Sequence, residues 1–280
     1  MILNFTKMHG IGNDYVYIDA VNQTVENREQ LAVSMSDRHF GIGGDGIILI
    51  CPSEVADFRM EMYNADGSQG KMCGNGIRCF SRFVYEKGLT DKTEIDVETL
   101  AGIKHVVMTE DNGKITSITV NMGAPVFECP KIPVLFDGEE MIGQPITIGG
   151  MNFKATCVSM GNPHCVVYVD DVDNFPLEDI GPRFEINPLF PDRVNTEFVR
   201  KLPDGSLQMR VWERGSAETW ACGTGACAVL ASSVRNGVID GRQAIVHLRG
   251  GDLDIRWDEE SGDIFMTGGA DFVFDGQIEV

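Results

Sequence analysis

The stretch MCGNGIRC (72–79) decides the fold, because a stretch of the same kind returns as ACGTGAC at 221–227. Each is a cysteine followed by Gly-x-Gly and then by a segment of helical character. Adding 149 to a position in the first half carries Cys73 onto Cys222. The same offset carries Gly12-Asn13 onto Gly161-Asn162, Gly74 onto Gly223, Gly76 onto Gly225, Gly88 onto Gly237, and Phe58, Met60 and Met62 onto Leu207, Met209 and Val211.

Agreement at so many points over some 75 residues predicts two tandem copies of one domain. FRMEMY (58–63) and LQMRVW (207–212) alternate apolar and polar residues, as half-buried strands do. IRCFSRFVYEK (77–87) has helical periodicity and stops at a glycine. ACAVLASSVRN (226–236) is apolar on nearly every side, which predicts a helix buried in the middle of its domain.

Strand-like segments dominate the remaining sequence. We therefore expect an α+β fold of two homologous domains related by a pseudo-twofold, each a mainly antiparallel or mixed sheet wrapped around a central helix. The domains are predicted to span residues 1–120 and 121–269, joined through a Pro- and Gly-rich stretch near 121–148. The expected strands are 45–50, 93–98, 103–109, 115–121, 153–159, 165–169, 197–201, 244–249, 253–257, 263–267 and 271–274.

Composition limits the partners. The 280 residues carry 23 Lys and Arg against 42 Asp and Glu, a net charge of −19. Such a chain repels nucleic acid and anionic membrane surfaces. The longest apolar run, IILIC (47–51), is too short to cross a bilayer, and the N-terminal residues lack a signal-peptide pattern. We expect a cytoplasmic protein with a small-molecule ligand.

A cysteine at a helix start has a chemical use. The unsatisfied N–H groups and the partial positive charge there stabilise a thiolate, and they can also bind a carboxylate by donating hydrogen bonds to it. If Cys73 and Cys222 faced one ligand from opposite sides, one could remove a proton while the other returned one on the opposite face. That is the chemistry needed to invert a stereocentre.

Plainer interpretations compete with this one. Most cysteines are structural, and we assign Cys51, Cys129 and Cys157 that role and place Cys79 and Cys227 in the core. The Cys spacing suits neither zinc nor a Cys-x-x-Cys redox motif, so no metal site is expected. GIGGDG (41–46) precedes a strand rather than following one, which argues against a nucleotide loop. Four histidines have no evident partner and could be structural: His9, His39, His105 and His247.

Across essentially its whole length the sequence resembles the diaminopimelate epimerase family, enzymes that interconvert LL- and meso-diaminopimelate without a cofactor. The motifs in this order are specific, whereas Cys-Gly-x-Gly alone would be weak. They are KMHGIGNDY (7–15), DRHFGIGGDG (37–46), NADGS (64–68), MCGNGIRC (72–79), VSMGNPHCV (158–166), RVNTEF (193–198), ERGSAETWACGTGACA (213–228) and MTGGA (266–270).

The resemblance implies roles for individual residues. Cys73 and Cys222 would be the acid/base pair, with His164 and Glu213 tuning thiol pKa. It also implies a role in lysine and peptidoglycan-precursor biosynthesis, a diamino dicarboxylate substrate, a homodimer, and a C-terminal strand (270–280) returning to the first domain. The residues expected to bind substrate are Asn13, Asn64, Gly74, Asn75, Asn162, Asn195, Glu213, Arg214, Gly223 and Thr224. Some relatives carry Gln where this chain has Gly46, so position 46 is left out of the site.

Three alternatives remain open from the sequence. Proline racemases and hydroxyproline epimerases share the opposed cysteines but act on a substrate without a distal amino acid, which suits the many Asn residues and Glu213-Arg214 less well. A PhzF-like isomerase lacks the cysteine pair. A thiol redox sensor, from another class of protein, would join the two cysteines in a disulfide and would have no substrate whose α-proton exchanges.

Overall fold

The structure is a computed structural model that describes residues 2–279. The chain divides into two compact units. The first runs from the N-terminus to Asn121 and includes the segment from Thr267 onward, and the second is Met122–Met266. Among the described residues, no helix has the length and apolar character needed to cross a membrane.

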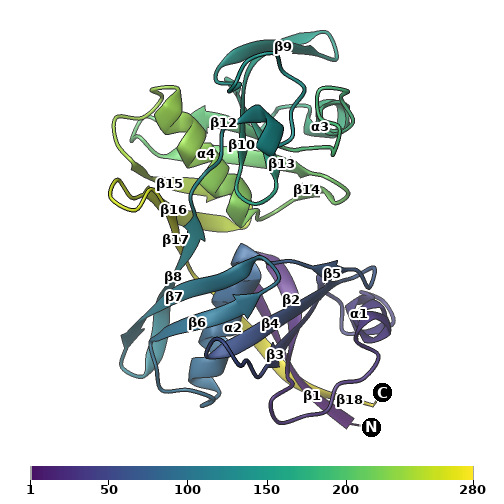
Figure 1. Ribbon diagram of the computed structural model, residues 1–280. Coiled ribbons are helices and arrows are strands. Elements are labelled where there is room, and N and C mark those ends of the chain that lie inside the picture. Colours follow the sequence, from purple (N-terminus) through teal and green to yellow (C-terminus); the bar gives the residue numbers. More distant parts are fainter. Residues whose placement is uncertain (1, 280) are drawn as a thin grey trace. The chain divides into compact units, whose positions relative to one another are not determined.

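The first unit is one mixed sheet with a helix on each face (Figure 1). Two pairs of neighbouring strands in this sheet, β2–β3 and β4–β6, are parallel. The other neighbours in the spatial order given below are antiparallel. A short strand, β5 (Gln69–Gly70), pairs antiparallel with the end of β4. In spatial order the strands are β18 (Asp271–Glu279), β1 (Ile2–Gly10), β2 (Asn13–Asp19), β3 (Gly46–Cys51), β4 (Phe58–Asn64), β6 (Glu94–Thr99), β7 (Gly102–Asp111) and β8 (Lys114–Gly123).

Alternation along β3 separates two cores. Ile47 and Leu49 pack with helix α1 (Arg28–Ser36) in one buried cluster. Ile48, between them, points to the other face, where it lies against Gly76 of helix α2 (Gly74–Glu86). Successive side chains of a strand point to opposite faces, so the two helices cover opposite sides of the sheet. The helix α2 contacts β1, β2, β3 and β7 and is therefore the helix around which this sheet wraps.

The second unit repeats this plan. Its parallel pairs are β11–β12 and β13–β15, and α3 (Leu177–Glu185) and α4 (Gly223–Arg235) take the places of α1 and α2. The short β14 (Ala217–Thr219) pairs antiparallel with the end of β13, as β5 does with β4. A further strand, β17 (Ile264–Gly268), contains the point where the chain leaves the second unit, after Met266. The remaining strands, in spatial order, are β9 (Gln144–Ile148), β10 (Met151–Ser159), β11 (Pro163–Tyr168), β12 (Asn195–Lys201), β13 (Leu207–Glu213), β15 (Gln243–Leu248) and β16 (Gly251–Trp257).

Several helices and strands of the two units agree in their first and last residues once the offset of 149 is applied. Adding 149 to the bounds of β1, α1, β4, α2 and β6 reproduces the bounds of β10, α3, β13, α4 and β15 without a change. An offset found on glycines and cysteines thus also superposes the elements between them. Any residue of the first unit can therefore be compared with its repeat mate at the same place in the second.

The α+β fold class with two repeated segments is confirmed. Each expected strand corresponds to an observed one, with ends that differ by a few residues. The two helices begin three residues earlier than their apolar patterns indicated, at Gly74 and Gly223, because the glycines already have helical geometry. The helix α4 is buried almost throughout, as its composition predicted. The helices α1 and α3 were not anticipated, nor were the strands β1, β2, β5, β9 and β14.

Candidate active site

Each copy presents a thiol at a helix N-terminus. Cys73 is the N-cap of α2 and has extended backbone angles, and its Sγ accepts a hydrogen bond from Gly76 N at 3.3 Å. Cys222 caps α4 in the same way, with Gly225 N at 3.4 Å. Both sulfurs therefore occupy the place where Ser or Asp usually caps a helix. The partial positive charge of the helix end favours a thiolate there.

In the first unit Cys73 contacts the side-chain amide of Asn13, whose orientation is fixed by Asp45. The Cys73 thiol donates to Asn13 Oδ1 at 3.3 Å, and Asn75 Nδ2 donates to the same oxygen at 3.4 Å. The other end of the Asn13 amide is fixed, because Nδ2 donates to Asp45 Oδ2 at 2.6 Å. Asn13 consequently presents its carbonyl oxygen, rather than its NH2 group, toward Cys73.

Two neighbours of this half-site were not predicted. Asp45 also accepts from the backbone N–H of Asp14, and burial followed by the charge of Asp14 raises the pKa of Asp45. Tyr15 is buried, and its pKa is raised well above the usual value by burial and then by the nearby Cys73. The offset of 149 could have identified Tyr15, since it is the repeat mate of His164.

Asn64 and Gly46 lie opposite each other at the end of this sheet. Asn64 ends β4, and its Nδ2 donates to Ser68 Oγ at 3.0 Å. Gly46 is its partner across the β3–β4 ladder and pairs with Tyr15 on the other side. A Cβ built on Gly46 would collide with the carbonyl oxygen of Tyr63. With this backbone, position 46 has no room for a side chain.

In the second unit Cys222 lies beside a carboxylate. Its thiol donates to Glu213 Oε2 at 3.3 Å, while the Thr219 hydroxyl donates to the other oxygen, Oε1. The Thr224 hydroxyl is 3.6 Å from the same sulfur. Burial, and then the charges of Glu213 and Glu197, raise the pKa of Cys222 well above the usual thiol value. This environment favours the protonated thiol.

A line of hydrogen bonds runs from Thr224 into the interior. Asn162 Nδ2 donates to Thr224 Oγ1 at 3.3 Å, and Asn162 Oδ1 is 3.0 Å from His164 Nε2. His164 Nδ1 is in turn 2.6 Å from Glu197 Oε1, and both side chains are fully buried. The resemblance indicated His164 but gave no role to Glu197.

Asn195 and Arg214 form the remaining part of the predicted substrate site. Asn195 begins β12, and its Oδ1 accepts from the backbone N–H of Arg214 at 2.9 Å. One arm of the Arg214 guanidinium donates to Asp192 O at 3.1 Å, and the side chain is otherwise exposed. The backbone of Arg214 is thus fixed while part of its charged fork faces solvent.

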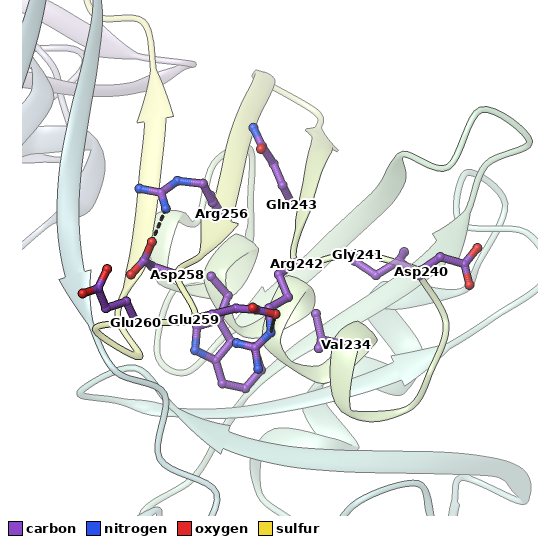
Figure 2. Close-up of a pocket in the computed structure, with 11 residues that line it drawn as sticks. Val234, Asp240, Gly241, Arg242, Gln243, Arg256, Asp258, Glu259 and Glu260 are labelled. Atoms are coloured by element: carbon purple, nitrogen blue, oxygen red, sulfur yellow. Dashed lines mark hydrogen bonds and ion pairs between the residues drawn. The ribbon is translucent and has the colours of Figure 1, made fainter.

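One hollow of the second unit lies away from the predicted site residues. A cavity of about 780 Å³ is lined by the end of α4 and by residues near 240 and 258, none of which is a predicted site residue (Figure 2). Both of its arginines already have partners: Arg256 pairs with Asp258 at 2.6 Å, and Arg242 stacks over Trp257 and pairs with Glu259. Among residues 2–279, no group of three or more His, Cys, Asp or Glu side chains could hold a metal ion.

Solved structures of the same architecture include epimerases, racemases and isomerases. A hydroxyproline epimerase from Agrobacterium vitis superposes with a TM-score of 0.74 at 16% identity, covering 99% of this chain and 92% of that one. A PhzF-family phenazine biosynthesis protein from Bacillus anthracis gives 0.72 at 19% identity, with both chains fully covered. The chain therefore shares the two-domain fold of these proteins.

Sequence comparison narrows the class. The family profile described as diaminopimelate epimerase matches residues 5–128 and 156–273. Proteins named diaminopimelate epimerase from Methanococcus maripaludis strain C5 and Acetivibrio thermocellus are 53% and 54% identical over 278 residues, covering 99% of this chain and 99–100% of theirs. One from Leptospira biflexa is 50% identical with both chains fully covered. The chain belongs to the diaminopimelate epimerase family, which confirms the expectation of an isomerase.

Proposed function

We propose that this chain interconverts LL- and meso-diaminopimelate, with Cys73 and Cys222 as the acid/base pair. The observation that carries the proposal is the repetition of one feature, a cysteine capping a central helix, at an interval of 149 residues. Epimerisation needs two proton-transfer groups that reach one carbon from opposite faces, and a duplicated domain supplies two copies of one group.

The proton balance is simple. A thiolate on one face removes the α-proton, and the electron pair of the C–H bond moves into the substrate carboxylate as an enolate. The thiol on the other face then donates its proton to the α-carbon. After one turnover the thiol and the thiolate have exchanged places, so the reverse reaction uses the same two residues with their roles exchanged.

Charge on the reacting carboxylate must be stabilised while the carbanion exists. The first N–H groups of a helix have no partners within the helix, and here they belong to Gly74 and Asn75 in α2 and to Gly223 and Thr224 in α4. Donors fixed in advance at the place where charge develops stabilise the transition state more than the ground state. We assign these four residues to the reacting carboxylate.

The distal amino acid of the substrate requires a second recognition set. Arg214, Asn64 and Asn195 offer donors for a carboxylate, and Glu213 offers an acceptor for an ammonium group. This set favours diaminopimelate over proline, which has no second carboxylate or amine. His164 does not contact the substrate in this proposal and acts through its hydrogen bond to Asn162. The proposal includes no cofactor, and from the family resemblance a homodimer in the cytoplasm, which light scattering and cell fractionation would test.

The deciding experiment is α-proton exchange in D2O, with LL-diaminopimelate and proline compared side by side and without pyridoxal phosphate. We expect deuterium at the α-carbon of diaminopimelate, formation of the meso isomer, and no exchange into proline. Exchange into proline alone would favour the proline racemase alternative. Absence of exchange in both, together with a reversible disulfide, would favour the redox sensor.

A further inference from the structure

The two half-sites differ at one buried position. Glu197 lies at the middle of β12 with no exposed surface, and its repeat mate in β3 is Ile48. Both lie against the second glycine of the Cys-Gly-x-Gly motif, three residues after the capping cysteine. A Cβ on Gly225 would meet Glu197 Oε1 at 2.9 Å, and a Cβ on Gly76 would meet Ile48 Cδ1 at 2.6 Å. The fold therefore accommodates an apolar side chain where the second unit has a carboxylate.

Stability does not account for this carboxylate. Glu197 Oε1 has one partner, His164 Nδ1, while Oε2 is buried and has no hydrogen-bond partner among the described residues. An unsatisfied buried oxygen lowers stability, and replacing a buried charged pair by well-packed apolar residues is often neutral or stabilising. Burial accordingly raises the pKa of Glu197. A residue with this disadvantage is retained for something other than packing.

The hydrogen bonds beyond His164 indicate that purpose. Asn162 Oδ1 can only accept, so the His164 Nε2 that faces it must carry a hydrogen. A neutral imidazole has one N–H, and the group opposite the other nitrogen decides which nitrogen holds it. At 2.6 Å, Glu197 Oε1 shares a proton with Nδ1, which leaves Nε2–H for Asn162 in either charge state of the pair. Fixing Asn162 Oδ1 in turn directs its NH2 group to Thr224.

The amides of the two repeat mates therefore face opposite ways. Asn13 is held at its NH2 end by Asp45 and offers an oxygen to Cys73. Asn162 is held at its oxygen end by His164 and offers its NH2 group to Thr224, whose hydroxyl is 3.6 Å from the Cys222 sulfur. A donor is what a substrate carboxylate needs, so the orientation of Asn162 matters for the chemistry beside Cys222.

We propose that Glu197 is a positioning residue for the epimerisation at Cys222, acting through His164, Asn162 and Thr224. This inference rests on the proposed function. It assigns Glu197 no contact with substrate. Its task is to fix the hydrogen on His164 Nε2, so that Asn162 and Thr224 are oriented as donors before the ligand arrives. Ile48 performs no such task, because in the first unit Asp45 orients the corresponding amide.

Three variants test the proposal. Glu197→Met removes the carboxylate and keeps a long apolar side chain. Glu197→Gln keeps a hydrogen-bonding group, since its amide NH2 can donate to His164 Nδ1 and leave Nε2–H in place. Ile48→Met is the matched control, because it makes a volume-conserving change at the same place in the other unit.

The activity readout separates positioning from space filling. We expect Glu197→Met to lower kcat by about 10- to 100-fold with a smaller change in KM, because misplaced donors weaken transition-state interactions most. Glu197→Gln and Ile48→Met should stay within a few-fold of the wild type. Wild-type kcat in Glu197→Met would overturn the proposal. Equal loss in the Gln and Met variants would overturn it too, since charge rather than hydrogen bonding would then matter.

A second readout needs no substrate. Long-range proton–nitrogen NMR of the imidazole rings, with the His164 signals assigned from a His164→Gln variant, reports which nitrogen is protonated. We expect protonated Nε2 in the wild type and in Glu197→Gln, and a mixture of tautomers in Glu197→Met. An unprotonated Nε2 in the wild type would overturn the proposal even if no variant folded. If the wild type failed to turn over diaminopimelate, the proposed function would fail while this signature could still be measured.

Discussion

The Cys222 sulfur lies 3.3 Å from Glu213 Oε2, whereas the repeat mate of Glu213 in the first unit is the neutral Asn64. Two further positions beside Cys222 differ in the same way. The repeat mate of His164 is Tyr15, and the repeat mate of Glu197 is the apolar Ile48. One fold has thus been duplicated with its thiol retained and the ionisable groups around the thiol changed. Two thiols in different surroundings can begin a catalytic cycle in different protonation states.

Replacing Glu213 by Gln should lower the pKa of Cys222. Burial is the larger cause of the raised pKa and remains in the variant, but the charge of Glu213, the second cause, is removed. A lower pKa means that Cys222 becomes a thiolate at a lower pH. We expect the pH midpoint of its alkylation by iodoacetamide, measured by peptide mass spectrometry, to fall.

Cys73 serves as the control within the same molecule, because it lies in the other unit and Asn64 takes the place of Glu213 there. Its alkylation profile should be the same in Glu213→Gln as in the wild type. A Cys222 profile that did not move, or that moved upward, would remove Glu213 as a determinant of the thiol pKa.

Each thiol should be indispensable for epimerisation. Cys73→Ala and Cys222→Ala each remove the proton-transfer group of one face. The loss should exceed the factor of ~10²–10⁴ usual for acid–base assistance, since no other group replaces the thiol. Formation of meso- from LL-diaminopimelate, followed by circular dichroism, measures it. Near-normal turnover in either variant would exclude the two-thiol mechanism.

Oxidation should join the two thiols if both reach one α-carbon. We expect a Cys73–Cys222 disulfide after mild oxidation, loss of activity, and recovery with dithiothreitol. Peptide mapping under non-reducing conditions identifies the link. All eight cysteines are thiols in the structure, which leaves six others for comparison. A link that involved only other cysteines would argue against the paired arrangement.

The parts of the fold and of the site that the sequence predicts are those with a recognisable sequence pattern. Cys-Gly-x-Gly and the offset of 149 report backbone needs, and these recur in both copies, so the repeat and its central helices could be predicted. The helix α3 was missed because Pro182 lies inside it, and α1 because its apolar residues make only a weak stripe. Glu197 was missed because one acidic residue in VNTEFV looks like an exposed strand position; only the fold shows that it is buried against His164.

Arg214 provides a test of substrate recognition. Its backbone is fixed by Asn195, and one arm donates to Asp192 O, which leaves the planar fork positioned to bind a carboxylate. Lysine keeps the charge but offers a point donor in place of a fork. We expect Arg214→Lys to raise KM for diaminopimelate by about tenfold or more, the effect of losing roughly one charge-assisted hydrogen bond. Unchanged KM and kcat would remove Arg214 from the substrate site.

The absence of a side chain at Gly225 should be required for catalysis rather than for folding. A Cβ there would lie 2.9 Å from Glu197 Oε1 and 3.1 Å from the Cys222 sulfur, so Gly225→Ala must displace one or both. Alanine is also the better helix former by up to about 1 kcal/mol, which offsets part of the steric penalty. We expect kcat to fall by about 10- to 100-fold while the thermal midpoint shifts by only a few degrees. Gly241→Ala is the control, because a Cβ there meets no atom within 4 Å. A Gly225→Ala enzyme with wild-type kcat would show that the thiol and the carboxylate tolerate displacement.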